Sequence, residues 1–122
     1  MENTMPDLSG FSGTQNYWRW TPVSPIFLTD GVKYLTDELN AGWLISSAEH
    51  FLTTRKKIKD SRHIIEIQLE VKANGNALMT LENEFGVYAK RKFSSTNFPS
   101  EGIGLWAYPY DRNWIIMLQS EY

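Results

Sequence analysis

The sequence predicts an α+β domain in which an antiparallel β-meander of four to five strands is covered on one face by two helices from the first half of the chain. Two observations support this prediction. Apolar residues recur at helical spacing in the first half and alternate with polar residues in the second. The 122 residues are also enough for one domain with its own core. We therefore expect a single domain over residues 11–122, preceded by a disordered polar segment, residues 1–10.

The first helix is predicted to begin at Thr29 and Asp30. Both are good N-cap residues, because a short side-chain oxygen can accept a hydrogen bond from the amides of the first turn. Val32, Leu35 and Leu39 then recur on one helical face. Asp30 could instead be a catalytic or metal-binding carboxylate, but capping is the commoner role of Asp at such a position.

A second helix is predicted from Trp43 to about Lys56, after a break at residues 40–42. Cations at its end are favoured by the helix dipole, and they are also what a phosphate backbone would need. Both interpretations stay open for a group of five basic residues: Arg55, Lys56, Lys57, Lys59 and Arg62.

The strands begin where the apolar period changes to two, at residues 65–71. A three-residue loop at residues 73–75 would pair Val71 with Ala77, apolar against apolar, and would give Gly75 the left-handed position of the turn. Further strands are predicted at residues 87–93, 103–108 and 114–118. The first of these contains a second basic group, which could pair with acidic residues of neighbouring strands: Lys90, Arg91 and Lys92.

Aromatic residues are plentiful, with five Trp, six Tyr and six Phe. Pro22 and Pro25 make the segment at residues 17–20 extended or turned, so it could be a stacking platform for a base or a cation, or an aromatic lid over the core. Trp and Tyr are also typical anchors of protein interfaces. The partner-binding candidates are Tyr17, Trp18, Arg19 and Trp20 in a first group, and Trp106, Tyr108 and Tyr110 in a second.

Composition excludes several functions. The net charge of −2 gives no global attraction to nucleic acid or anionic membrane. Without cysteine there is no disulfide, no thiol catalysis and no Cys-ligated zinc, which fits a cytoplasmic protein. No signal peptide, transmembrane run, phosphate-binding glycine loop or helical metal-ligand spacing is present, so we expect no membrane, no metal and no cofactor. The one catalytic arrangement we considered would bring Asp30, Tyr34 and His50 together across the two helices.

A set of short motifs extends over nearly the whole chain: Phe11-Ser12-Gly13-Thr14, Asn16-Tyr17, Thr29-Asp30-Gly31-Val32-Lys33-Tyr34-Leu35, Trp43-Leu44-Ile45, Thr96-Asn97-Phe98-Pro99 and Leu118-Gln119-Ser120-Glu121-Tyr122. Together they resemble a family of small bacterial proteins of unknown function. The start of the first helix is the specific part of the resemblance. Asn97 and Gln119 depart from the pattern, which has Asp and Pro there. Relatives occur in bacterial genomes, on phages and on other mobile elements. Small proteins from such settings often bind another protein, and some disable host defence systems, so the resemblance is associated with a binding role and does not indicate a mechanism.

From the sequence we therefore expect a non-catalytic protein-binding or regulatory module, in one specific form a mobile-element inhibitor of a CRISPR nuclease. A nucleic-acid-binding protein that uses residues 55–62 is one alternative. A small-ligand pocket or enzyme site between the helices and the sheet is another. A homodimer is also open, through edge pairing of the strand that ends at Leu118.

Overall fold

The computed structural model describes residues 4–60 and 63–122. Its helices are α1 (Asp30–Glu38), α2 (Gly42–Thr54) and α3 (Lys56–Lys59). Its strands are β1 (Tyr17–Arg19), β2 (Ile26–Thr29), β3 (Ile65–Val71), β4 (Ala77–Asn83), β5 (Gly86–Phe93), β6 (Ile103–Tyr110) and β7 (Asn113–Leu118), and a short 3-10 helix, η1 (Gln119–Glu121), follows β7.

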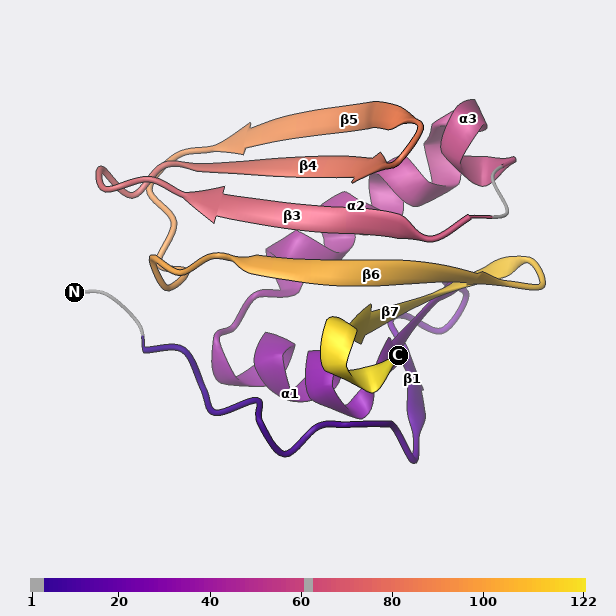
Figure 1. The fold of residues 1–122 in the computed structure, drawn as a ribbon, viewed down its shortest axis with the longest axis horizontal. Coiled ribbons are helices and arrows are strands. Elements are labelled where there is room, and N and C mark those ends of the chain that lie inside the picture. The colour runs from indigo at the N-terminus through magenta and orange to yellow at the C-terminus, as the bar shows by residue number, and fades with distance from the viewer. Residues whose placement is uncertain (1–3, 61–62) are drawn as a thin grey trace.

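All seven strands form one sheet in the order β1-β2-β7-β6-β3-β4-β5 (Figure 1). The α+β class is confirmed. The predicted meander of four to five strands is corrected in three ways. β1 and β2 add to the sheet, and β2 pairs with β7 in parallel. β6 pairs with β3 instead of β5, so the strands do not follow one another as in a meander. The remaining neighbours are antiparallel.

The core lies between the sheet and the helices, and α2 lies behind the sheet in Figure 1. Alternate residues of the strands, such as Ile67 and Leu105, are fully buried on this face. Val32 and Leu35 of α1 and Leu52 of α2 are buried against them. Removing this much apolar surface from water is the main stabilising contribution to such a fold.

The β3–β4 hairpin confirms the predicted register, with Val71 opposite Ala77. Gly75 has a φ of 86°, as the left-handed position of the three-residue loop requires. The second helix was predicted two residues too long. It ends at Thr54, and the separate turn α3 directs Ile58 into the core.

The start of α1 is where the prediction about capping was wrong. The Thr29 hydroxyl donates to Glu121 Oε1 (2.6 Å). The Asp30 carboxylate accepts from the Gln15 amide and the Trp18 indole N–H, so neither side chain caps the helix. The carboxylate of Glu121 takes that role, accepting from the Gly31 amide (3.0 Å) and the Leu118 amide (3.0 Å). A carboxylate at a helix N-terminus also interacts favourably with the helix dipole.

Gly31 leaves room for this packing, because a side chain there would have to displace the ends of two neighbouring side chains. A Cβ atom there would lie 2.5 Å from Leu118 Cδ1 and 2.8 Å from Glu121 Oε1. We call this arrangement of Thr29, Gly31 and Glu121 the C-terminal clasp. It joins the start of α1 to η1, so the helix-start motif and the C-terminal motif of the sequence form one structural unit.

Two further expectations concern the edges and the N-terminus. The strand that ends at Leu118 is not an edge strand, because β7 lies between β2 and β6, so edge pairing of that strand in a homodimer is ruled out. The edges of the sheet are β1 and β5. Of the N-terminal segment, residues 1–3 lie outside the described part of the chain, and Met5 and Leu8 lie partly buried against the core.

Candidate functional site

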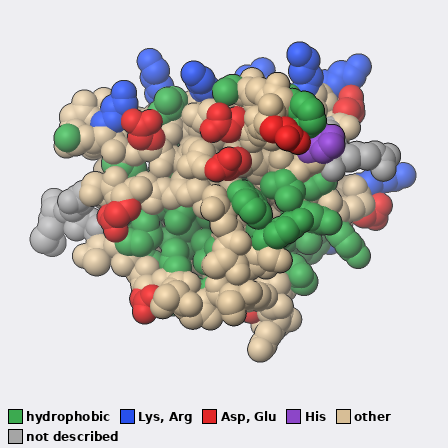
Figure 2. All heavy atoms as spheres, in the orientation of Figure 1, with side chains coloured by type: hydrophobic (Ala, Val, Ile, Leu, Met, Phe, Trp, Pro, Cys, Tyr) green, Lys and Arg blue, Asp and Glu red, His purple; other side chains and the backbone are tan. Residues whose placement is uncertain are grey.

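One face of the sheet is covered by the helices, and the other, the open face, shows two different halves. Figure 2 looks onto the open face. Hydrophobic side chains gather over its lower part, acidic side chains form a band above them, and Lys and Arg side chains line the upper edge, where Figure 1 shows β5. We call the part over β1, β2, β7 and β6 the aromatic half and the part over β3, β4 and β5 the charged half.

The aromatic half is hollowed. The hollow has a volume of about 690 Å³ and is lined by Tyr17, Phe27, Tyr108, Tyr110, Asn113, Ile115, Met117, Glu121 and Tyr122. Three of these tyrosines remain well exposed, with 57% of Tyr17, 63% of Tyr110 and 70% of Tyr122 accessible to solvent. A hollow of this size, with mainly apolar walls and few polar groups, has the general character of a binding site.

The sheet register places the floor of the hollow. Phe27 of β2 lies opposite Ile115 of β7, which lies opposite Tyr108 of β6. Because side chains alternate between the faces of a strand, these three residues point to the open face while their neighbours enter the core.

The last residues of the chain form one wall. The Tyr122 ring meets Trp106 almost at right angles, with ring centroids 5.1 Å apart, and lies 6.2 Å from Tyr108. Edge-to-face contacts of this kind are favourable for aromatic rings. Because the C-terminal clasp holds Glu121, it also fixes the position from which Tyr122 leaves η1.

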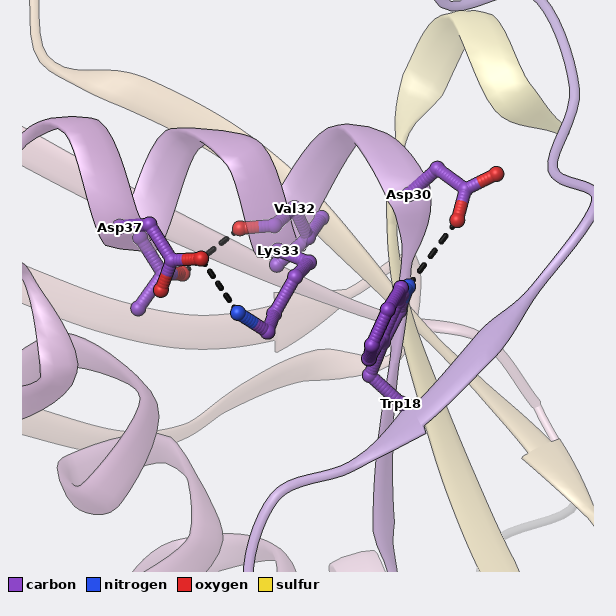
Figure 3. Close-up of polar contacts among 6 residues, drawn as sticks. Trp18, Asp30, Val32, Lys33 and Asp37 are labelled. Atoms are coloured by element: carbon purple, nitrogen blue, oxygen red, sulfur yellow. Dashed lines mark hydrogen bonds and ion pairs between the residues drawn. The ribbon is translucent and has the colours of Figure 1, made fainter.

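The first predicted aromatic group is divided between the two faces of the sheet. Tyr17 lines the hollow, and Arg19 stacks over Phe27 with its Cζ atom 4.6 Å from the ring centroid. Trp18 points the other way, and its indole N–H donates to Asp30 Oδ1 (3.0 Å; Figure 3). Trp20 packs against the core, so it is part of the aromatic lid that was the alternative interpretation.

Asp30 has a structural place in this arrangement. The Trp18 indole N–H and the Gln15 amide both donate to its carboxylate, and these bonds hold the pKa of Asp30 below its ordinary value. Its own amide donates to the Thr14 hydroxyl (2.8 Å). Asp30 therefore connects the segment before β1 to the start of α1.

The second predicted group, on β6, is brought together with part of the first. Tyr108 and Tyr110 line the hollow with Tyr17, and Trp106 supports its wall. Sequence reasoning missed the other lining residues: Phe27, Asn113, Ile115, Met117, Glu121 and Tyr122. The alternation of residues 113, 115 and 117 along β7 was the available signal, but it could not be assigned to a face without knowing the neighbours of β7.

The two basic groups do not share a face. Arg55, Lys56, Lys57 and Lys59 are exposed at the α2–α3 end, on the side of the sheet that the helices cover. Lys90 and Lys92 are exposed on the open face of β5. Arg91 faces the helices, where its guanidinium donates to Ser47 Oγ (3.2 Å), and Arg62 lies outside the described residues.

The expected charge pairing of β5 is also not made. Lys90 lies opposite Thr80 and Lys92 opposite Leu78. In residues 4–60 and 63–122, the ion pair within 4 Å joins Lys33 to Asp37, one turn apart on α1 (Figure 3). Lysines on an edge strand have another physical role, since they oppose pairing with a second sheet.

Among the described residues, the three considered for catalysis are not joined by hydrogen bonds, and each has other contacts. Asp30 contacts Trp18, the Tyr34 ring lies 5.5 Å from Phe11, and the His50 ring lies 5.3 Å from Phe51. A smaller hollow of about 460 Å³ is lined by Leu39, Asn40, Trp43, Phe93, Ser94, Ser95, Thr96, Asn97 and Phe98. Within the described ranges, no group of three or more His, Cys, Asp or Glu residues is placed to hold a metal ion.

Comparison with known proteins places the chain in a family. A family model described as a family of unknown function (DUF6876) matches residues 2–122. The chain belongs to this family. The resemblance read from its motifs is thereby confirmed for this DUF6876 member, and none of the curated proteins matches it.

A solved structure supports the fold of this DUF6876 member. The crystal structure of the protein of unknown function from Enterococcus faecalis matches with a TM-score of 0.55 and 18% sequence identity, over 88% of this chain and 98% of that chain. At this identity the likeness concerns the fold alone. In the described part of the chain, no helix is long and apolar enough to cross a membrane.

Proposed function

We propose that this DUF6876 member is a non-catalytic protein-binding module and that its partner docks on the aromatic half of the open face. One observation supports this most directly. Tyr17, Tyr110 and Tyr122 come from three different segments of the chain and are well exposed, yet all three line the same hollow. Single exposed apolar residues need no explanation, whereas a contiguous exposed apolar patch is typical of an interaction site.

The chemistry of these rings fits a protein partner. Tyrosine offers a large apolar ring and a hydroxyl, with few torsions to fix on binding, which is why it is frequent among the residues that dominate interface affinity. The floor residues Phe27 and Ile115 belong to strands held on both sides by neighbours. Such a surface is formed before the partner arrives, so less entropy is lost on binding.

A narrower form of the proposal makes the partner a cytoplasmic host defence protein, such as a CRISPR nuclease, and this chain a mobile-element inhibitor. Its support is the resemblance given by the sequence motifs. Nucleic-acid binding has weaker support, because the basic groups lie on two sides of the sheet and Trp106, at the edge of the aromatic half, faces Glu66 on the next strand. A carboxylate beside a stacking ring repels phosphate.

The proposal can be tested by placing a photoreactive benzoylphenylalanine at position 110 and, in a separate variant, at position 85. Phe85 is the matched control, because it is also an exposed aromatic residue (65% accessible) but lies in the turn between β4 and β5. In the native host we expect a covalent product with another protein from position 110 that position 85 does not give.

Three results would contradict the proposal. They are the same products from both positions, a product with nucleic acid from position 110, and a product that contains only a second copy of this chain. Nuclease treatment and mass spectrometry of the crosslinked species distinguish these results.

A further inference from the structure

We propose that the hollow of the aromatic half is a receptor for an arginine side chain, so that the partner presents an exposed arginine in a basic segment. This inference rests on the proposed function, because it concerns the same surface, and it specifies the chemistry that the surface recognises. Three features of the described residues support it.

The first feature is the wall of aromatic rings. Four tyrosines, Tyr17, Tyr108, Tyr110 and Tyr122, line the hollow together with Phe27. Aromatic faces have negative electrostatic potential and attract cations, and this attraction increases where the cation is partly removed from water. A planar guanidinium also stacks on rings and is weakly hydrated, so it loses less than an ammonium group on entering such a site.

The second feature is the charge around the hollow. The described residues that line it include one carboxylate, Glu121, which the C-terminal clasp already binds, and no lysine or arginine, while Arg19 lies at the rim over Phe27. The charge that faces a cationic partner therefore lies beside the hollow. The sheet continues from Trp106, at the edge of the aromatic half, to Glu66 on β3 and Glu82 on β4, which lie opposite one another. A basic segment that leaves the hollow in this direction would meet carboxylates, and charges arranged in this way favour association with a cationic partner.

The third feature is a guanidinium already bound at the rim. Arg19 lies over Phe27 at 4.6 Å from the ring centroid, and its Nη1 atom donates to the carbonyl oxygen of Ser24 (3.0 Å). The protein thus shows, with its own chain, how this surface holds a stacked guanidinium. The tyrosine hydroxyls and the Asn113 side-chain oxygen provide acceptors for the N–H groups of a second one.

The test compares an arginine peptide with one that lacks its charge and with one that keeps the charge and lacks the planar shape. Acetylated, amidated Ala-Arg-Ala is titrated into the full-length protein, followed by the backbone amide shifts of β6 and β7, beside the same peptide with citrulline or with lysine. Citrulline has the planar outline of arginine without the charge. We expect the arginine peptide to bind roughly five- to thirty-fold more tightly than the citrulline peptide, the range that a cation–aromatic contact provides. The lysine peptide should be weaker than the arginine peptide.

The salt dependence of peptide binding and the effect of substitutions show whether the peptide binds in the hollow. Binding should persist in about 0.5 M sodium chloride, where attraction to exposed carboxylates is largely screened. Tyr110→Leu and Tyr108→Leu should each lower the affinity for the arginine peptide several-fold, and Phe85→Leu should leave that affinity unchanged. Tyr110 is exposed, so its variant tests the site even if Tyr108→Leu is poorly folded.

Equal binding of arginine and citrulline peptides would mean that the hollow is merely apolar and would overturn the proposal. So would equal binding of the lysine peptide, shifts confined to β3 and β4 that disappear in salt, or the absence of saturable shifts. These failures are separate from failure of the proposed function, because a partner could still be crosslinked at position 110 through a different chemistry.

Discussion

The two halves of the open face share one pleated sheet and differ in what they present to solvent. On the charged half most outward positions are polar, as at Glu66, Thr80 and Lys90. On the aromatic half most of them are aromatic or aliphatic, as at Phe27 and Tyr108. The opposite face of both halves is packed in the same core, so the core does not explain the difference. The charged half is an ordinary solvated sheet face, and the aromatic half departs from that pattern, which is why we place the function there.

The halves also differ in how their outer edges are protected. β5 has eight residues and Lys90 and Lys92 on its open face, whereas β1 has only three residues. A long edge is kept from pairing with other sheets by lysines, and a short one offers little to pair with. The basic group of β5 therefore has a structural explanation that the tyrosines of the aromatic half lack.

The largest difference expected between the two halves is in the stability lost when one glutamate is substituted in each. Glu121→Ala removes the acceptor of the Gly31 and Leu118 amides and of the Thr29 hydroxyl, all at buried positions. An unsatisfied buried donor costs about 1–3 kcal/mol, so we expect the free energy of unfolding in urea to fall by about 3 kcal/mol.

Glu82→Ala, in the charged half, is the matched control for that measurement and should change the free energy of unfolding by less than about 0.5 kcal/mol. Equal losses for the two variants would contradict the role of the C-terminal clasp. A loss for Glu121→Ala with unchanged amide shifts around Tyr122 would contradict the inference that the clasp fixes the wall of the hollow.

The next effect concerns affinity. Once a partner has been identified by crosslinking, Tyr110→Ala should lower the affinity for that partner by about tenfold or more, as truncation of an aromatic anchor commonly does. Because Tyr110 is well exposed, thermal stability should remain close to that of the parent chain. Lys92→Ala, in the charged half, should leave the affinity measured by calorimetry unchanged. A larger loss from Lys92→Ala than from Tyr110→Ala would reverse the assignment of the two halves.

Local features of the two halves could be predicted from the sequence, and long-range pairing could not, for a physical reason. The alternation of β3 and the loop at Gly75 are local signals, and both the register and the turn were predicted correctly. The parallel pairing of β2 with β7 depends on residues nearly ninety positions apart, such as Phe27 and Ile115, and nothing local indicates it. Without that pairing, the sequence could not show that Tyr17 and Tyr108 share a hollow.

The capping error has the same origin. Thr29 and Asp30 satisfy the local preference for an N-cap, and the preference predicted the start of α1 correctly. Glu121 reaches the Gly31 amide from the far end of the sequence and displaces the local cap. A contact across ninety residues is decided by tertiary packing, so the position of the helix could be predicted and its capping group could not.

A smaller effect is expected from removing the edge protection of the charged half. The double change Lys90→Thr and Lys92→Val leaves an uncharged, β-prone edge strand on β5. We expect this variant to associate at concentrations where the parent chain does not, measured by sedimentation velocity over a concentration series. Tyr17→Thr, at the three-residue edge β1, is the control and should not associate. If the control associates and the lysine variant does not, β1 is the edge that needs protection.

The smallest expected effect is that of Asp30, which ties the outer strand of the aromatic half to α1. Hydrogen bonds from Trp18 and Gln15 lower the pKa of Asp30 from its ordinary value of 3.8. A group whose pKa is lower in the folded state than in the unfolded state stabilises the fold at pH values above its unfolded pKa. This contribution is lost as the pH falls through the pKa of the folded state. Asp30→Asn should therefore be less stable than the parent chain at neutral pH, and the difference in melting temperature should shrink as the pH falls below about 3.8. A difference that grows in acid would mean that the protonated carboxyl holds Trp18 better than the carboxylate does, and β1 would then owe its place to other contacts.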